Sequence, residues 1–253
     1  MCGIAGIFDF RGRREISRAA LVRMNDSQAH RGPDGDGVFL APGVGLGHRR
    51  LSIIDIATGQ QPLFNEDGSV VVVFNGEIYN YRELIPELQA LGHVFHTRSD
   101  TEVIVHAWEA WGEACVERFR GMFAFALYDN NTETLFLARD RLGVKTLFYS
   151  VPSDGTVGYG SALKSLVAHG ALGREIDVCA VEEYFALGYV PEPRSIFLGT
   201  SKLAPGHRLT VRRGQPFPVP VQYWDVQFSL SSTLTEAAAC DELVQRLQES
   251  VKL

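Results

Sequence analysis

Apolar residues along this chain follow two spacings, one typical of strands and one typical of helices. Residues 3–10 are apolar and partly β-branched, which predicts a first strand, and residues 44–54 predict a second. Residues 70–74 form a continuous apolar run, typical of a strand covered on both faces. A hairpin is expected around the turn at 129–132, and further strands are expected at residues 122–128, 134–138, 147–151, 156–160 and 207–212.

Helices are predicted where apolar residues recur every three to four positions behind a capping side chain. Ser17 is expected to cap a first helix, Asn80 a second and Asp100 a third, with Gly112 as the stop of the third. Pro86 lies inside the second helix and is expected to kink or shorten it. The predicted helices after the first are residues 81–91, 101–111, 162–169, 178–187 and 235–253. Strands interleaved with helices indicate a mixed α and β protein.

The last part of the chain differs from the rest. Proline becomes frequent after Leu187, and residues 215–222 are expected to be a linker. The helix at 235–253 has apolar residues on one face and nothing evident to pack upon. The sequence therefore predicts one domain at residues 1–212, followed at 213–253 by a linker and the first helix of a truncated second domain.

Composition narrows the class of protein. A chain of 253 residues, 45% apolar and 21% charged, is long enough for one good core and has the balance of an ordinary soluble protein. The net charge of −6 argues against binding to a nucleic-acid backbone. Neither a signal peptide nor an apolar run of about 20 residues is visible, so a cytoplasmic protein without a membrane segment is expected.

Metal sites and disulfides are not predicted. The four cysteines show no close pairing, which favours neither a zinc site nor a disulfide framework. His93 and His96 are spaced loosely like metal ligands, but no pattern supplies a third ligand. The expectation from the sequence is therefore that no residue of this chain binds a metal.

Cys2 is the most informative single residue. If Met1 is removed, Cys2 carries a thiol and a free α-amine on one α-carbon. An α-amine titrates at about 7.7–8.0, so it can accept the thiol proton, and the thiol needs no histidine to become a nucleophile. The alternative is an inert buried thiol, the usual state of a free cysteine. If Met1 is retained, the nitrogen is an amide and the protein is expected to be inert.

Five segments rich in chemical residue types follow one another along the chain: Met1-Cys2-Gly3-Ile4-Ala5-Gly6, His30-Arg31-Gly32-Pro33-Asp34-Gly35, His48-Arg49-Arg50-Leu51-Ser52-Ile53-Ile54-Asp55, Phe74-Asn75-Gly76-Glu77-Ile78-Tyr79-Asn80 and Arg98-Ser99-Asp100-Thr101-Glu102. In this order they resemble the class II glutamine amidotransferase domain, above all that of glutamine-hydrolysing asparagine synthetases. The resemblance covers roughly the first 210 residues. It implies an α+β fold, the four-layer α-β-β-α sandwich of the N-terminal-nucleophile (Ntn) hydrolases.

The resemblance also implies a set of site residues. Cys2 would be the nucleophile, and Asn75 and Gly76 would donate to the oxyanion from a strand end. Arg50 would hold the α-carboxylate of glutamine, and Glu77 and Asp100 its α-ammonium. Backbone groups of the segment that contains Leu51, Ile53 and Ile54 would line the same pocket. For Asp100 the role of helix cap competes with substrate binding, and one residue can do both.

The predicted function is hydrolysis of L-glutamine to glutamate and ammonia through a Cys2 thioester. The Ser-Gly-Gly-Xaa-Asp-Ser loop that binds ATP in asparagine synthetases is absent. ATP and Mg²⁺ are therefore expected only for a C-terminal synthetase domain missing from this chain, which would receive the ammonia. The resemblance leaves room for a homodimer.

Two other functions stay open. One is a catalytically silent, amino-acid-binding relic of the same fold, which the retained Cys2, Arg50, Asn75 and Asp100 argue against. The other is an Ntn amidase for a different amide, which the pairing of Arg50 with Asp100 argues against. Thr146 and Ala162 depart from the family pattern but lie outside the proposed hydrolytic set.

Overall fold

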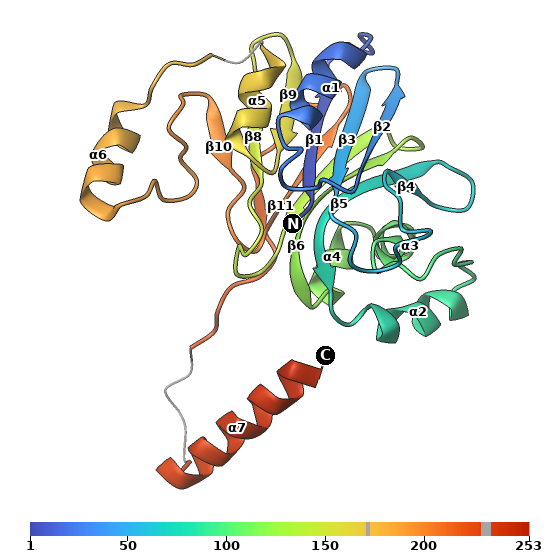
Figure 1. Ribbon diagram of the computed structural model, residues 1–253, viewed down its shortest axis with the longest axis vertical. Helices are drawn as coiled ribbons and strands as arrows, with labels where there is room; N and C mark the ends of the chain where they lie inside the picture. The colour runs from blue at the N-terminus through green and yellow to red at the C-terminus, as the bar shows by residue number, and fades with distance from the viewer. Residues whose placement is uncertain (171–172, 229–233, 253) are drawn as a thin grey trace.

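Two antiparallel sheets stack face to face, with helices on their outer faces (Figure 1). The structure is a computed structural model that describes residues 1–170, 173–228 and 234–252. The first sheet has the order β10-β8-β9-β1-β3-β2, made of β1 (Gly3–Asp9), β2 (Gly35–Ala41), β3 (Val44–Arg50), β8 (Phe148–Ser150), β9 (Thr156–Gly160) and β10 (Thr200–Lys202). The second has the order β12-β11-β7-β6-β5-β4, made of β4 (Leu63–Phe64), β5 (Val70–Ile78), β6 (Gly121–Asp129), β7 (Thr134–Arg139), β11 (His207–Arg212) and β12 (Val221–Gln222).

Helices form the two outer layers. The first sheet is covered by α1 (Arg18–Asp26) and α5 (Leu163–His169), which also contact each other. The second sheet is covered by α2 (Tyr81–Ala90), α3 (Glu102–Trp111) and α4 (Cys115–Arg118), with the short 3₁₀ helix η1 (Gly112–Ala114) between the last two. The layer order is helix, sheet, sheet, helix (Figure 1). This confirms the α+β, four-layer sandwich that the sequence predicted.

Strand β5 explains why the sandwich holds together. Its side chains alternate between two cores, as strand geometry requires. Val71 and Val73 pack between the sheets, whereas Val72 and Phe74 pack against α2 and α3 on the other face. All four are buried, so the prediction of a strand covered on both faces is confirmed.

The ends of two strands differ from the prediction, and both lie in polar segments that the sequence analysis singled out. β3 ends at Arg50, so residues 51–54 are not strand. β5 continues to Ile78, because it stays paired with β6 through Asn75↔Ala124 and Gly76↔Phe123. Asn75 and Gly76 therefore lie within a paired strand and not at its end.

Ser17 and Asn80 occupy the N-cap positions of α1 and α2 as predicted, whereas Asp100 does not occupy that of α3. The Ser17 side chain accepts a hydrogen bond from the backbone N–H of Ala20 at the start of α1. Asn80 precedes α2 but makes no capping bond; its amide instead bonds the backbone of Arg118 and Arg120. The N-cap of α3 is Thr101, and the Asp100 carboxylate accepts a hydrogen bond from the N–H of Ile78 on β5.

Other helical details follow the sequence more closely. Gly112 ends α3 with a φ of 56°, a left-handed value that glycine tolerates. α2 contains Pro86 and continues to Ala90. The hairpin of β6 and β7 forms around the turn that begins after Asp129.

The C-terminal part of the chain differs from the prediction in one element. Val221 and Gln222, expected in a linker, pair with His207 and Arg208 as β12 at the edge of the second sheet. Two helices lie away from the two sheets (Figure 1): α6 (Val178–Leu187), which precedes β12 in the chain, and α7 (Glu236–Lys252), which follows it. α7 buries none of its side chains, and Leu253 falls outside the described residues. Within the described residues, no helix is both long and apolar enough to cross a membrane.

Candidate active site around Cys2

One pocket lies where the start of β1 meets the end of β5. The pairing of Gly3 with Arg49 places Cys2 beside the residues that follow β3. Every site residue proposed from the sequence lines this pocket: Cys2, Arg50, Leu51, Ile53, Ile54, Asn75, Gly76, Glu77 and Asp100. Its volume of about 130 Å³ exceeds several times the roughly 10–15 Å³ that one water molecule requires. The pocket can therefore admit a small molecule.

The Cys2 sulfur faces this pocket and is held by the backbone of Leu51. The N–H of Leu51 donates to Sγ at 3.4 Å, and the thiol donates to the carbonyl of Leu51 at 3.6 Å. The carbonyl of Cys2 accepts a bond from Nε of Arg31 at 3.1 Å. The nucleophile candidate is thus fixed from both sides, with part of its surface open.

Met1 also lines the pocket, and it is 56% exposed. Nζ of Lys145 donates to Sδ of Met1 at 3.0 Å. Burial lowers the pKa of Lys145, and the nearby Arg31 lowers it further. While Met1 is attached, the nitrogen of Cys2 is a peptide nitrogen, which cannot act as a base.

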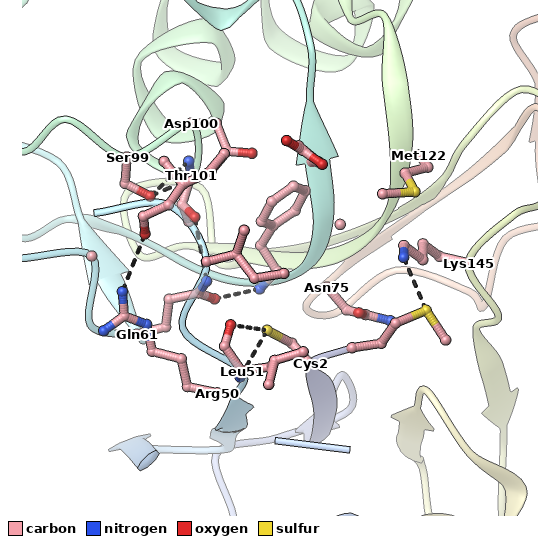
Figure 2. A pocket seen from close by; sticks show the side chains of 17 residues that line it. Cys2, Arg50, Leu51, Gln61, Asn75, Ser99, Asp100, Thr101, Met122 and Lys145 are labelled. Carbon is pink, nitrogen blue, oxygen red and sulfur yellow. Dashed lines mark hydrogen bonds between the residues drawn. The ribbon is translucent and has the colours of Figure 1, made fainter. Parts of the chain in front are cut away.

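Asn75 has the most unusual environment in the pocket. Its side chain is 1% exposed, yet neither its amide nitrogen nor its amide oxygen has a hydrogen-bond partner. Leaving a buried polar group unpaired costs about 1–3 kcal/mol. Because the side chains of a strand alternate, Asn75 points the same way as Val71 and Val73, into the space between the sheets, on the side where Cys2 precedes β1 (Figure 2). Such an amide is poised to bond a ligand.

The backbone N–H of Gly76 points toward the same pocket. Phe123, the partner of Gly76 on β6, bonds Asp140 through both its N–H and its carbonyl. The N–H groups of Phe74 and Ile78, two residues to either side, donate to Gln61 and Asp100, which both line the pocket. Alternation along the strand directs the Gly76 N–H to that edge as well.

Gly76 is also the residue that the close backbone approach requires. A Cβ atom there would lie 2.2 Å from the carbonyl oxygen of Met122 and 2.6 Å from Cα of Phe123. Neither backbone atom can move without shifting β6. Only glycine therefore fits at this position.

Arg50 is buried, and its guanidinium holds the loop that follows it in the chain. Its Nη1 donates to the carbonyl of Ile56 at 3.1 Å, and its Nη2 donates to the carbonyls of Asp55 at 2.6 Å and Ile54 at 3.3 Å. These bonds hold residues 51–56 against the pocket, which Leu51, Ile53 and Ile54 line. A guanidinium has five N–H donors, so two remain for a ligand.

Two carboxylates, Asp100 and Glu77, line the pocket, and Asp100 lies on the side away from Cys2 (Figure 2). Asp100 is 4% exposed, and its Oδ2 accepts a bond from the N–H of Ile78 at 2.9 Å. The pKa of Asp100 is raised to about 6, mainly by burial and also by the nearby charge of Glu77. A positive group bound between Asp100 and Glu77 would relieve this repulsion.

Comparison with known proteins agrees with this geometry. A family model described as "Glutamine amidotransferase domain" matches residues 1–224. The chain belongs to this family.

Relatives of this amidotransferase domain include asparagine synthetase (glutamine-hydrolyzing) 1 of Bacillus subtilis, 42% identical over 218 residues that make up 84% of this chain and 34% of the relative. A putative asparagine synthetase (glutamine-hydrolyzing) of Mycobacterium bovis is 40% identical over 247 residues, 92% of this chain and 38% of the relative. The chain thus spans about a third of the length of these curated relatives.

Among solved structures, glutamine phosphoribosylpyrophosphate amidotransferase from B. subtilis, complexed with ADP and GMP, matches with a TM-score of 0.64. The match covers 88% of this chain and 49% of the other, at 20% identity. At that identity the likeness concerns the fold, and it agrees with the Ntn-type sandwich.

Two residues of the amidotransferase pocket had no role in the sequence prediction. Gln61 accepts a bond from the N–H of Phe74 at 2.7 Å and donates to Oγ1 of Thr101 at 3.3 Å, so it joins β5 to the start of α3. Lys145 lies between β7 and β8 and reaches the pocket from that connection. Gln61 carried no signal in the sequence beyond being polar before a proline.

His48 connects the two sheets beneath the pocket. It is fully buried on β3, and its Nε2 donates to the carbonyl of Phe74 on β5 at 3.1 Å. Burial lowers the pKa of His48 to about 3, and the charge of Arg50 contributes. A neutral imidazole therefore ties the strand that ends at Arg50 to the strand that carries Asn75.

Proposed function

We propose that the domain hydrolyses L-glutamine to glutamate and ammonia with Cys2 as the nucleophile. The observation that carries this proposal is that the Cys2 sulfur opens on a pocket containing a buried Asn75 amide without partners. Desolvated donors aimed at a reacting atom are the hallmark of an oxyanion site. An inert structural cysteine would need neither the pocket nor the unpaired amide.

Recognition of the zwitterionic end of glutamine follows from the charges of the pocket. The α-ammonium would lie between Asp100 and Glu77, where it neutralises two neighbouring carboxylates. The α-carboxylate would accept bonds from the donors of Arg50 that the loop carbonyls leave free. The side-chain amide of glutamine would then extend toward Cys2, on the opposite side of the pocket.

The chemical step requires removal of Met1, which frees the α-amine of Cys2. The amine takes the thiol proton, and the thiolate attacks the carboxamide carbon. The oxyanion that forms accepts bonds from Asn75 Nδ2 and the Gly76 N–H. The carbon–nitrogen bond then breaks, and the leaving nitrogen takes the proton back and departs as ammonia. Water adds to the thioester in the same way, releasing glutamate and restoring the thiol.

The names of the relatives suggest where the ammonia goes. We infer that a longer protein carries an ATP-dependent, asparagine-synthetase-like domain that uses the ammonia, as the lengths of these relatives support. ATP and Mg²⁺ would bind to that domain. The cytoplasmic location and a homodimer stay part of this proposal.

The test is glutamate release by protein whose loss of Met1 is verified by mass spectrometry. Processed protein should turn over glutamine, and Cys2→Ala should not. Diazo-oxo-norleucine, a reactive glutamine mimic, should label Cys2 once per chain. Cys179→Ala removes an exposed cysteine far along the sequence and is the matched control, so it should keep both activity and labelling.

Two results would contradict the assignment. Ordinary glutamine turnover by Cys2→Ala would exclude Cys2 as the nucleophile. Processed protein that binds glutamine without turnover and without a diazo-oxo-norleucine adduct would instead support the silent, amino-acid-binding alternative.

A further inference from the structure

A second cluster of chemically active side chains lies outside the pocket of Cys2. Glu66 is in the turn between β4 and β5, His93 follows α2, and His106 and Glu109 lie on α3. Each offers one ligand atom, and these four atoms all lie within 4.8 Å of one another. None of the four residues lines the Cys2 pocket.

The spacing of the atoms fits a shared central ion. Nδ1 of His106 lies 3.3 Å from Glu66 Oε2 and 3.5 Å from Glu109 Oε2. Nδ1 of His93 lies 3.4 Å from Glu66 Oε1 and 3.7 Å from Glu109 Oε2. Zinc binds nitrogen and oxygen at about 2.0–2.2 Å, so the edges of its tetrahedron measure about 3.3–3.6 Å.

His106 supplies an independent observation. Its side chain is 0% exposed, and neither ring nitrogen has a hydrogen-bond partner although carboxylate oxygens lie close to both. The oxygens near Nδ1 therefore do not meet it in hydrogen-bond geometry. A buried nitrogen that lies close to two carboxylate oxygens without bonding to either is an arrangement that a cation between them would satisfy.

The groups behind the cluster hold it in this orientation. Oε1 of Glu102 lies 3.6 Å from Nε2 of His106, on the side away from the cluster. Glu102 is itself fixed by the N–H groups of His96 and Thr97. A carboxylate behind an imidazole is the usual support of a metal-binding histidine, because it keeps the proton on the far nitrogen.

Glu109 is supported in a similar way. Its Oε1 accepts a bond from Nδ2 of Asn65 at 2.8 Å, which leaves Oε2 directed toward the two histidines. Glu66 Oε1 accepts a bond from the N–H of Val94 at 2.9 Å. The two carboxylates together carry two negative charges, which a divalent cation neutralises.

We propose that Glu66, His93, His106 and Glu109 bind one divalent transition-metal ion, and that Zn²⁺ fits the site best. Two imidazoles and two carboxylates suit zinc in nitrogen and oxygen coordination, whereas Mg²⁺ and Ca²⁺ prefer oxygen alone. The ion joins three segments that are distant in sequence, and it anchors the stretch 93–98 that leads to Ser99 and Asp100. Its role is structural, since it lies outside the pocket.

The competing explanation is an ion-pair cluster in which a protonated histidine is held by the carboxylates. In that case the cluster needs no metal, and added zinc changes nothing. The two explanations predict different numbers of zinc ions bound per chain, different effects of zinc on the Tm and different atoms around the zinc.

The experiment uses the whole chain as Cys2→Ala, stripped with a chelator, so that the pocket thiol does not bind metal. Titration with Zn²⁺ alone should show one ion per chain and raise the Tm. X-ray absorption should show nitrogen and oxygen neighbours, including two imidazoles, and no sulfur. His93→Ala and Glu109→Gln change side chains that reach the surface, and each should weaken binding at least about 10-fold.

His96→Ala is the matched control. His96 is the other histidine of the same segment, is exposed and offers no atom to the cluster, so this variant should bind Zn²⁺ as tightly as the parent. Equal affinity in His93→Ala and His96→Ala, sulfur among the zinc neighbours, or no saturable binding by the parent would each overturn the proposal. These measurements do not use glutamine, so they stand or fall independently of the glutaminase.

Discussion

The backbone N–H of Leu51 donates a hydrogen bond to the Sγ atom of Cys2 over 3.4 Å. The two residues are 49 positions apart in the chain and meet because β1 and β3 pair next to the pocket. Leu51 directly follows Arg50, so one short segment holds the sulfur and closes the loop over the pocket.

Asn75→Ala should lower kcat by about 10²–10³-fold with little change in KM, because the lost amide donor serves the oxyanion. The Tm should stay level or rise, since the wild-type amide has no partner in the free protein. The measurements are steady-state glutaminase kinetics and a thermal melt. A higher KM with an unchanged kcat would mean that Asn75 binds substrate and does not stabilise the oxyanion.

Asp100 should make glutamine binding depend on pH. The pKa of this buried carboxyl is raised to about 6, and only its ionised form attracts the α-ammonium. The KM for glutamine should therefore rise as pH falls from 7.5 through 6. In Asp100→Asn the KM should be about 10–100-fold higher at pH 7.5 and flat across this range.

The thermal stability of Asp100→Asn provides a control for the pKa of Asp100. A carboxyl whose folded pKa lies above its unfolded value of 3.8 costs stability once pH rises from about 4 through 6. Asp100→Asn should therefore melt at a higher temperature than wild type at pH 7.5 and show little gain at pH 4. A pH-dependent KM that survives in Asp100→Asn would point to Glu77 in its place.

Arg50→Lys should raise KM and loosen the loop. Lysine keeps the charge but loses the planar fork that bonds the carbonyls of Ile54, Asp55 and Ile56. We expect faster limited proteolysis within residues 51–58, slowed again by saturating glutamine. Arg49→Lys, the neighbouring arginine that pairs with Asp26, is the control and should leave KM and proteolysis unchanged. An unchanged loop with a raised KM would assign Arg50 to substrate binding alone.

His48→Gln should reduce the acid sensitivity of the fold. The folded pKa of His48 is about 3, below its ordinary 6.5, so the unfolded chain takes up a proton first and stability falls as pH drops from about 6.5 toward 3. Glutamine still donates to the Phe74 carbonyl but does not titrate. The difference between the melting temperatures of wild type and variant should thus shrink as pH falls. It should shrink by about 2–4 °C for each kcal/mol of unfolding free energy that the wild type loses. If the two melting temperatures fell in parallel as pH drops, His48 would not be the cause of the acid sensitivity.

The sequence was sufficient where structure depends on neighbouring residues. The unbroken apolar run at 70–74, the Ser17 cap and the Gly112 stop are local features, and each appeared as predicted. It was insufficient at the ends of β3 and β5, because pairing with another strand decides where a strand stops. Asp100 shows the same limit: it resembles a helix cap, yet its carboxylate accepts a bond from Ile78 on β5.

What the sequence determined by itself was the set of chemical groups, the Ntn-type sandwich through its ordered motifs, and the place of Cys2 directly after Met1. Only the tertiary structure decided how these groups converge, since Cys2, Arg50, Asn75 and Asp100 share a pocket through the stacking of two sheets. It also placed His93 against His106 on α3, a contact that the sequence did not indicate. Distance along a chain says little about distance in space once strand pairing and layer packing set the contacts.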